Sequence, residues 1–274
     1  MRVGLLSRLI YIGGYGRSGS TLLEYLLTAS GAVVACGEVA RHFERFGRIK
    51  TCTCGRPMQD CPLWGAFQHS SGRLAGWDHE TLTLALLAHV SDDYAVMVDS
   101  SKTAWGSLLT PFRLHKRLGE DFLLVHLVRD PRAVCWSTVR TAHRHRDTRF
   151  TSGPTLRCLR TAFGWMIANL TCEAFGWLHP EQYTRLHYEK LVQSPQTMPS
   201  IILDKLSVAP TNLQPNHSLD NRHQLYGNSM RFKPLSLEEV REDVAWRSDM
   251  PQGLLRLATT LCWPLGVRYG YLQP

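Results

Sequence analysis

The feature that most constrains this chain is a glycine-rich loop between an apolar run and a helical pattern. Residues 8–13 read Arg-Leu-Ile-Tyr-Ile-Gly, which has the length and apolar content of a buried strand. Closely spaced glycines then interrupt the run, and Ser20 and Thr21 open a segment with leucines at helical spacing. A strand, a glycine loop and a helix in this order predict a parallel sheet with an anion site at the helix N-terminus.

The rest of the chain repeats the strand–helix alternation. Further strands are predicted at residues 33–35, 94–98, 122–128 and 183–187, and helices near 79–90, 104–118, 132–141, 156–178 and 195–206. Continuously apolar strands alternating with helices predict an α/β fold of the P-loop type, a central parallel sheet flanked by helices in three layers. We expect one domain over residues 1–274, with a cysteine-containing insertion near 41–92 and a basic loop near 142–155.

Composition limits the class of protein. The formal net charge of +8 favours an anionic partner, such as a nucleotide or an acidic substrate. The basic stretch has no interleaved aromatic residues, so we do not expect nucleic-acid binding. No apolar run is long enough for a membrane span, and the short apolar start lacks a cleavage signal. We therefore expect a cytoplasmic protein.

The glycine loop differs from that of nucleoside-triphosphate enzymes, which reads G-x-x-x-x-G-K-[ST]. Gly14 and Gly19 keep this spacing, but Ser20 stands where the lysine belongs and Arg17 supplies the cation instead. The loop is therefore predicted to bind phosphate with a different placement of charge. The alternative is a glycine turn that only permits tight packing.

The stretch Gly-Arg-Ser-Gly-Ser-Thr-Leu-Leu at 16–23 resembles the loop of sulfotransferases that use 3'-phosphoadenosine-5'-phosphosulfate (PAPS), especially the tyrosylprotein and bacterial branch. The resemblance implies a sulfotransferase that moves a sulfuryl group from PAPS to a hydroxyl acceptor by in-line displacement. It also implies that the loop holds the 5'-phosphosulfate, with Arg17 on its bridging and sulfuryl oxygens. The implied binding residues are Gly16, Arg17, Ser18, Gly19, Ser20 and Thr21.

A second anion site is indicated by Arg-Asp-Pro-Arg-Ala-Val-Cys-Trp-Ser at 129–137. An arginine and a serine can hold a phosphate through charge-assisted hydrogen bonds, although an exposed Arg–Asp pair at a helix start would read the same way. The segment resembles the 3'-phosphate motif of the same family, which implies that Arg129 and Ser137 bind that phosphate.

Two later segments also resemble the family. Tyr188-Glu189-Lys190-Leu191 follows a predicted strand, as does the family segment whose tyrosine lies near the nucleotide. Residues 227–233 stand where relatives carry a basic loop over the cofactor, which implies a cofactor contact for Arg231. The alternative for Arg231 is a solvated surface charge.

The resemblance also suggests the catalytic residues. Cys36-Gly37-Glu38 is similar to a segment of tyrosylprotein sulfotransferases and implies that Glu38 is the general base; a helix-capping glutamate is the alternative. Other members of the superfamily use a histidine, which makes His42 the reserve base. Lys102 matches a family lysine after a strand and would stabilise the departing bisphosphate, unless it is a surface lysine.

The cysteines Cys52, Cys54 and Cys61 resemble a segment of bacterial members of the family. Together with Cys36 they could hold a structural zinc ion. Their spacing is not a standard C-x2-C pair, and no second pair follows. We therefore expect reduced, packed cysteines and a reaction that needs no metal, with the zinc site as the alternative.

Two other functions fit part of the pattern. In a P-loop kinase, Asp99 would bind magnesium after its strand, but the missing loop lysine argues against this class. In a non-catalytic nucleotide-binding protein, the anion sites would persist without chemistry. The motifs leave the acceptor open among small molecules, glycans, lipids and peptides.

Overall fold

The computed structural model describes residues 7–41, 49–71, 77–104, 107–144, 153–208, 222–233 and 236–273. Its centre is a five-stranded sheet in the order β2-β3-β1-β4-β5, and every neighbouring pair of strands is parallel. The strands are β1 (Arg8–Gly13), β2 (Val33–Ala35), β3 (Val96–Asp99), β4 (Phe122–Val128) and β5 (Tyr183–His187). The predicted α/β fold with a central parallel sheet is thereby confirmed.

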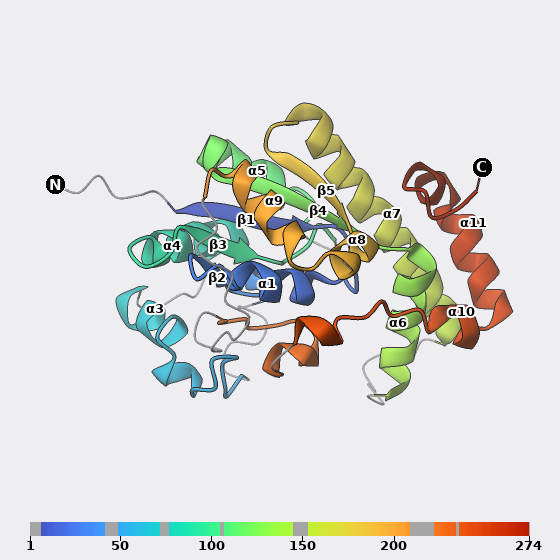
Figure 1. Ribbon diagram of the computed structural model, residues 1–274, viewed down its shortest axis with the longest axis horizontal. Coiled ribbons are helices and arrows are strands. Elements are labelled where there is room, and N and C mark those ends of the chain that lie inside the picture. The colour runs from blue at the N-terminus through green and yellow to red at the C-terminus, as the bar shows by residue number, and fades with distance from the viewer. Residues whose placement is uncertain are drawn as a thin grey trace.

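Helices cover both faces of the sheet (Figure 1). They are α1 (Ser20–Thr28), α3 (Trp64–Ser71), α4 (His79–Val90), α5 (Thr110–Leu118), α6 (Pro131–Arg144), α7 (Pro154–Leu178), α8 (Tyr188–Gln193), α9 (Thr197–Lys205), α10 (Trp246–Asp249) and α11 (Gln252–Arg268). Short 3-10 turns are η1 (Val39–Arg41), η2 (Met58–Asp60), η3 (Gly119–Asp121), η5 (Ser229–Phe232) and η6 (Leu237–Glu239).

The alternation of side chains along β1 explains why its sequence is apolar throughout. Leu9 and Tyr11 enter the hydrophobic cluster that includes residues of α3, α4 and α5. Ile10 and Ile12 point to the opposite face and pack with residues of α1, α8 and α9. Because both faces are covered, both sets of side chains are excluded from water, as is usual for parallel sheets.

A third cluster forms where α6, α7 and α11 pack against one another and against the end of β4 (Figure 1). Trp165 of α7 is fully buried there, and its indole N–H donates to the Arg129 carbonyl oxygen at 3.2 Å. This contact fixes the backbone immediately after β4, where the second predicted anion motif begins.

Two boundaries differ from the sequence expectation. The helix predicted over 104–118 begins at Thr110, because Pro111 fits the first turn of a helix but would break its interior. The basic loop expected near 142–155 is shorter, since α6 continues to Arg144 and α7 begins at Pro154. Residues 145–152 of that loop lie outside the described residues.

The described part of the chain contains no helix that is long and apolar enough to cross a membrane.

Candidate active site

The glycine loop after β1 has a backbone that only glycine can supply at two positions. Gly14 and Gly19 have φ angles of +99° and +97°. A Cβ atom at Gly14 would lie 2.5 Å from the carbonyl oxygen of Leu127, and one at Gly19 would lie 2.6 Å from the Tyr188 ring. Because the glycines have no side chain, β4 and Tyr188 can pack directly against the loop. The two glycines therefore permit this packing as well as the turn of the backbone.

The N-terminus of α1 is suited to an anion. Gly19 caps the helix without a side-chain hydrogen bond, and the first turn has no acidic residue. The Ser18 hydroxyl is buried and has no hydrogen-bond partner among the described residues. Buried polar groups are nearly always hydrogen-bonded, and helix N-termini favour negative charge. A phosphate or sulfate group at this loop would satisfy both.

The segment after β3 docks directly onto the loop. The Thr103 N–H donates to the Gly14 carbonyl oxygen at 3.1 Å, and the Gly14 N–H donates to the Thr103 hydroxyl at 3.0 Å. Lys102 has a φ angle of +70°, which is unusual for a residue with a side chain. Its side chain passes 4.0 Å from the position that a Cβ atom on Gly16 would take. Lys102 is therefore held beside the loop.

The carboxylate of Glu38 lies between two cations. The Lys102 ammonium donates to Glu38 Oε1 at 2.9 Å, and Arg41 Nε lies 3.1 Å from Oε2. Burial by itself would raise the pKa of Glu38, but the charges of Lys102 and Arg41 outweigh it and hold that pKa below its ordinary value. Glu38 is thus ionised at neutral pH and can accept a proton.

Arg17 adds to the positive charge around the loop. Burial lowers the pKa of its guanidinium, and the charge of Glu38 opposes this effect, while Arg129 and Arg140 reinforce it. Since arginine stays protonated in proteins, several cations lie on this side of the sheet, where Glu38 pairs with Lys102 and Asp243 pairs with Arg140. An anion placed here would gain electrostatic stabilisation.

Arg129 connects the two predicted anion sites. Its Nη1 donates to the Arg17 carbonyl oxygen at 3.0 Å, and its Nη2 donates to the Asp243 carbonyl oxygen at 3.0 Å. Its guanidinium carbon lies 4.3 Å from the centre of the Tyr188 ring. Because Tyr188 also contacts Gly19, the three predicted motifs meet in one place. Ser137 lies farther along α6 and is half-buried.

The segment that carries Arg231 rests on the start of α1. The Asn228 N–H donates to the Thr21 hydroxyl at 3.2 Å. Arg231 Nη1 donates to the Gly227 carbonyl oxygen at 2.7 Å, whereas its buried Nε has no hydrogen-bond partner in the described ranges. Burial lowers the pKa of Arg231, and the charge of Glu38 opposes that shift. The positive charge of Arg231 thus acts on the same carboxylate as Lys102 and Arg41.

Three supporting residues were missed in the sequence. Glu24 of α1 is fully buried, accepts from the Gly37 N–H at 3.0 Å and accepts from Gln224 Nε2 at 2.7 Å. Burial raises the pKa of Glu24 to about 8. A glutamate among the leucines of an apolar helix was the available signal. For Arg41 the available signal was its position three residues after Glu38, whereas Asp243 gave none, because its partners Arg129 and Arg140 are more than 100 positions away.

Asp99 does not have the setting of a magnesium ligand. It is fully buried, and its Oδ1 accepts from the Ser101 N–H at 2.8 Å and from the Ser101 hydroxyl. Its Oδ2 lies 2.8 Å from His79 Nε2 and accepts from the Thr83 hydroxyl at 3.3 Å. Both oxygens are thus engaged within the protein. His42, the reserve base, lies outside the described residues.

Comparisons with known proteins agree with the family resemblance of the sequence motifs. A family model described as the sulfotransferase family matches residues 10–211. The sulfotransferase domain of the olefin synthase from Synechococcus PCC 7002 is 19% identical, has a TM-score of 0.58, and the match covers 98% of this chain and 96% of that one. The sulfotransferase domain from the curacin biosynthetic pathway is 16% identical with a TM-score of 0.56, over 98% and 99% of the two chains. No curated protein sequence matches this chain.

Proposed function

This chain belongs to the sulfotransferase family, and we propose that it transfers a sulfuryl group from PAPS to a hydroxyl acceptor. The observation that carries the proposal is the position of Lys102, which lies beside Gly16 of the phosphate loop and donates to Glu38 at 2.9 Å. One lysine thus connects the place where an anion fits with the carboxylate that can take a proton. Sulfuryl transfer needs these two functions side by side.

In this proposal, two sets of residues would hold PAPS. The buried Ser18 hydroxyl and the start of α1 offer hydrogen-bond donors to its 5'-phosphosulfate, with Arg17 as the adjacent cation. Arg129 and Ser137 would hold the 3'-phosphate, and Tyr188 would pack near the nucleotide. Arg231, with its unpartnered Nε, would close over the donor. When bound, PAPS supplies a sulfur atom activated by its bond to a phosphate oxygen.

The residues of the chain would divide the chemistry as follows. Glu38 removes the proton of the acceptor hydroxyl as the acceptor oxygen forms a bond to sulfur. Lys102 and Arg17 would neutralise the charge that develops on the 5'-phosphate oxygen as that oxygen leaves sulfur on the side opposite the acceptor. Before the proton is transferred, Lys102 would leave Glu38 for the phosphate oxygen. The Glu38 carboxylate would therefore be free to act as a base only when the donor is present.

Asp99 helps to separate this proposal from a kinase. Phosphoryl transfer from ATP uses a magnesium ion held by acidic ligands. Both Asp99 oxygens are instead occupied by Ser101, Thr83 and His79.

The direct test is incubation of the full chain with PAPS and mixtures of phenols, sugars, lipids and tyrosine peptides, followed by mass spectrometry. We expect an acceptor that gains one sulfuryl group, with stoichiometric release of 3'-phosphoadenosine 5'-phosphate and no need for magnesium. Lys102→Met should abolish the gain. A phosphoryl gain from magnesium-ATP, with none from PAPS, would contradict the proposal.

A further inference from the structure

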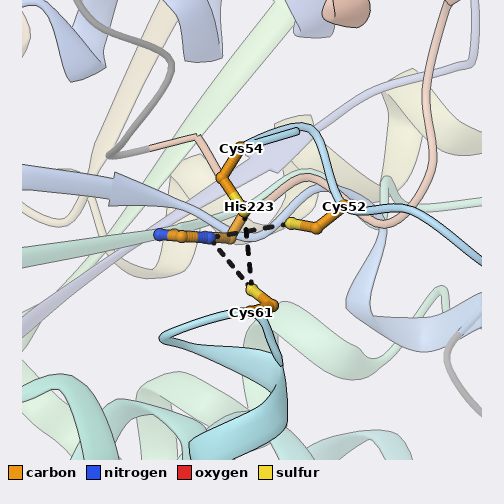
Figure 2. Close-up of side chains that lie close together, drawn as sticks. All are labelled: Cys52, Cys54, Cys61 and His223. Carbon is orange, nitrogen blue, oxygen red and sulfur yellow. Dashed lines mark hydrogen bonds between the residues drawn. The ribbon is translucent and has the colours of Figure 1, made fainter. Parts of the chain in front are cut away.

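A second cluster of reactive side chains lies outside the proposed transfer site. Figure 2 shows Cys52, Cys54, Cys61 and His223 with their sulfur and ring-nitrogen atoms turned toward one another. One ligand atom from each residue can be chosen so that all four lie within 4.8 Å of one another. Cys52, Cys61 and His223 are each 1% exposed, so the cluster is sealed from solvent on most sides.

The separations agree with the edges of a tetrahedral zinc site. Zinc bonds of about 2.3 Å to sulfur and about 2.0–2.1 Å to nitrogen give tetrahedral edges of about 3.8 Å between sulfurs and about 3.5 Å between sulfur and nitrogen. The Cys54 and Cys61 sulfurs are 3.9 Å apart. His223 Nδ1 lies 3.3 Å from the Cys61 sulfur and 3.6 Å from the Cys52 sulfur.

We propose that Cys52, Cys54, Cys61 and His223 bind one structural zinc ion through three thiolates and an imidazole nitrogen. Three sulfurs and one nitrogen complete a four-coordinate site with no position for a substrate, which is the arrangement of structural zinc. Binding releases the thiol protons, so the ion is held more tightly as pH rises through the thiol range. This inference does not depend on the proposed transfer reaction.

The remaining cysteines show what packed thiols look like in the same chain. Cys135, Cys158 and Cys262 each direct sulfur toward a backbone carbonyl oxygen, at 3.8, 3.7 and 3.8 Å respectively. The sulfurs of Cys54 and Cys61 are separated by far more than the disulfide bond length of about 2.05 Å, and a ring nitrogen of His223 lies 3.3 Å from the Cys61 sulfur. The expectation of reduced, packed cysteines therefore fits Cys135, Cys158 and Cys262 better than it fits the three cysteines beside His223.

The backbone around the cluster is arranged to hold these ligands. Gly55 has a φ angle of +85°, and its N–H donates to the Cys52 carbonyl oxygen at 3.0 Å, which closes a tight turn around Cys54. The Trp64 N–H points to the Cys61 sulfur at 3.4 Å, and the Trp64 indole N–H donates to the His223 carbonyl oxygen at 2.6 Å. Such outer contacts orient metal ligands in known zinc sites.

The zinc ion would join the inserted segment to the transfer site. The Thr53 hydroxyl donates to the Arg222 carbonyl oxygen at 2.5 Å and accepts from the Gln224 N–H at 2.9 Å. It therefore bonds to the backbone on both sides of His223. The backbone N–H of His223 donates to the Ala35 carbonyl oxygen of β2 at 2.9 Å. A Cβ atom on Gly37 would lie 2.9 Å from the Leu225 nitrogen. The cluster therefore supports the backbone that immediately precedes Glu38.

The test is the metal content of the full chain, purified in reducing buffer without chelator and measured by plasma mass spectrometry. We expect about one zinc per chain, retained through gel filtration and released when a mercurial reagent blocks the thiols. Replacement by cobalt should give the intense visible bands of a tetrahedral cobalt–thiolate site. A zinc content near zero after expression in zinc-supplemented medium, or a Cys54–Cys61 disulfide under the same reducing conditions, would overturn the proposal.

Variants locate the ion. Cys61→Ser and His223→Ala should each lower the retained zinc at least tenfold and lower the melting temperature, whereas the matched packing variant Cys262→Ser should retain wild-type zinc. Unchanged zinc in Cys61→Ser would contradict the assignment. If a ligand variant does not fold, the cobalt spectrum of the wild-type chain decides, because a spectrum without thiolate bands would also contradict it.

Discussion

At the residue scale, Glu38 combines two properties that usually exclude each other. Its carboxylate is largely buried, yet its pKa lies below the ordinary value because Lys102 and Arg41 are within 2.9 and 3.1 Å. A carboxylate with a low pKa is a weak base until a cation leaves it. The lysine that pairs with Glu38 is also the lysine nearest the phosphate loop, so donor binding and base release are coupled in our account.

Glu38→Gln tests this role directly. The amide keeps the size of the side chain but cannot accept the proton, so we expect kcat to fall by about 10²- to 10⁴-fold, the usual contribution of a general base. The affinity for 3'-phosphoadenosine 5'-phosphate, measured by calorimetry, should not fall, and we expect it to rise, because Lys102 no longer has to leave a carboxylate to reach the phosphate. The exposed Glu239→Gln is the control. Wild-type turnover in Glu38→Gln would remove Glu38 from the chemistry.

Glu24 gives a prediction for the pH dependence of stability. Its pKa is about 8 in the folded chain and 4.5 as an ordinary glutamate, so folding binds a proton between these values. The stabilisation is fully present below pH 4.5 and is lost as pH rises through 8. Between pH 7 and pH 9 this one group should lower the free energy of unfolding by about 1 kcal/mol, at about 1.4 kcal/mol per pKa unit.

Glu24→Gln should remove the loss of stability that Glu24 causes between pH 7 and pH 9. A glutamine can accept from the Gly37 N–H, and its amide N–H can donate to Gln224 Oε1 once the Gln224 amide, which presents Nε2 to Glu24, turns over. Urea unfolding of both proteins from pH 7 to pH 9 measures the difference, which should grow with pH in favour of the variant. Parallel pH curves for the two proteins would show that Glu24 is ionised throughout.

At the element scale, the sheet collects the site at one edge. The glycine loop, Glu38, Lys102, Arg129 and Tyr188 follow β1, β2, β3, β4 and β5 respectively. Since the strands are parallel, their carboxyl ends face the same way, which is where ligands bind in open α/β sheets. The short segment 222–226 adds to this edge, because its backbone bonds to β2 and packs against Gly37.

Gly37→Ala tests the importance of that packing. Gly37 has a φ angle of +75°, and an added Cβ would lie 2.9 Å from two backbone atoms of the 222–226 segment. Backbone cannot yield as a side chain can, so we expect unfolding to become easier by about 1–3 kcal/mol and kcat to fall as Glu38 moves. Gly253→Ala, where nothing lies within 4 Å, is the matched control and should be neutral or slightly stabilising. Equal effects of the two changes would refute this role for Gly37.

At the scale of the whole molecule, the sequence was sufficient for the five strands and for helices with clear patterns such as α1, α4 and α7, but not for α3, α8, α10 and α11 or for distant contacts. All five strands and the phosphate loop were predictable, because apolar runs, glycines and helix starts are local signals. His223 was not, since it lies 162 positions from Cys61, and Gln224 lies 200 positions from Glu24. Only folding brings such pairs together, so the three cysteines alone do not indicate that His223 lies beside them.

Part of the net positive charge of +8 lies beside the phosphate loop, where it would attract an anionic ligand. Arg17 and Lys102 lie by the phosphate loop, while Arg129 links that loop to the second motif through the Arg17 carbonyl oxygen. Arg17, Lys102 and Arg129 come from three segments that follow different strands, and together they suit a ligand with more than one anionic group.

The central claim is that this edge holds a nucleotide by its 3'-phosphate and its 5'-phosphate together. The most direct measurement is the heat stability of the folded chain with 3'-phosphoadenosine 5'-phosphate, adenosine 5'-phosphate or magnesium-ATP at equal concentration. We predict that the bisphosphate raises the melting temperature clearly and that removal of its 3'-phosphate abolishes most of the shift. Protection by magnesium-ATP without protection by the bisphosphate would contradict the account.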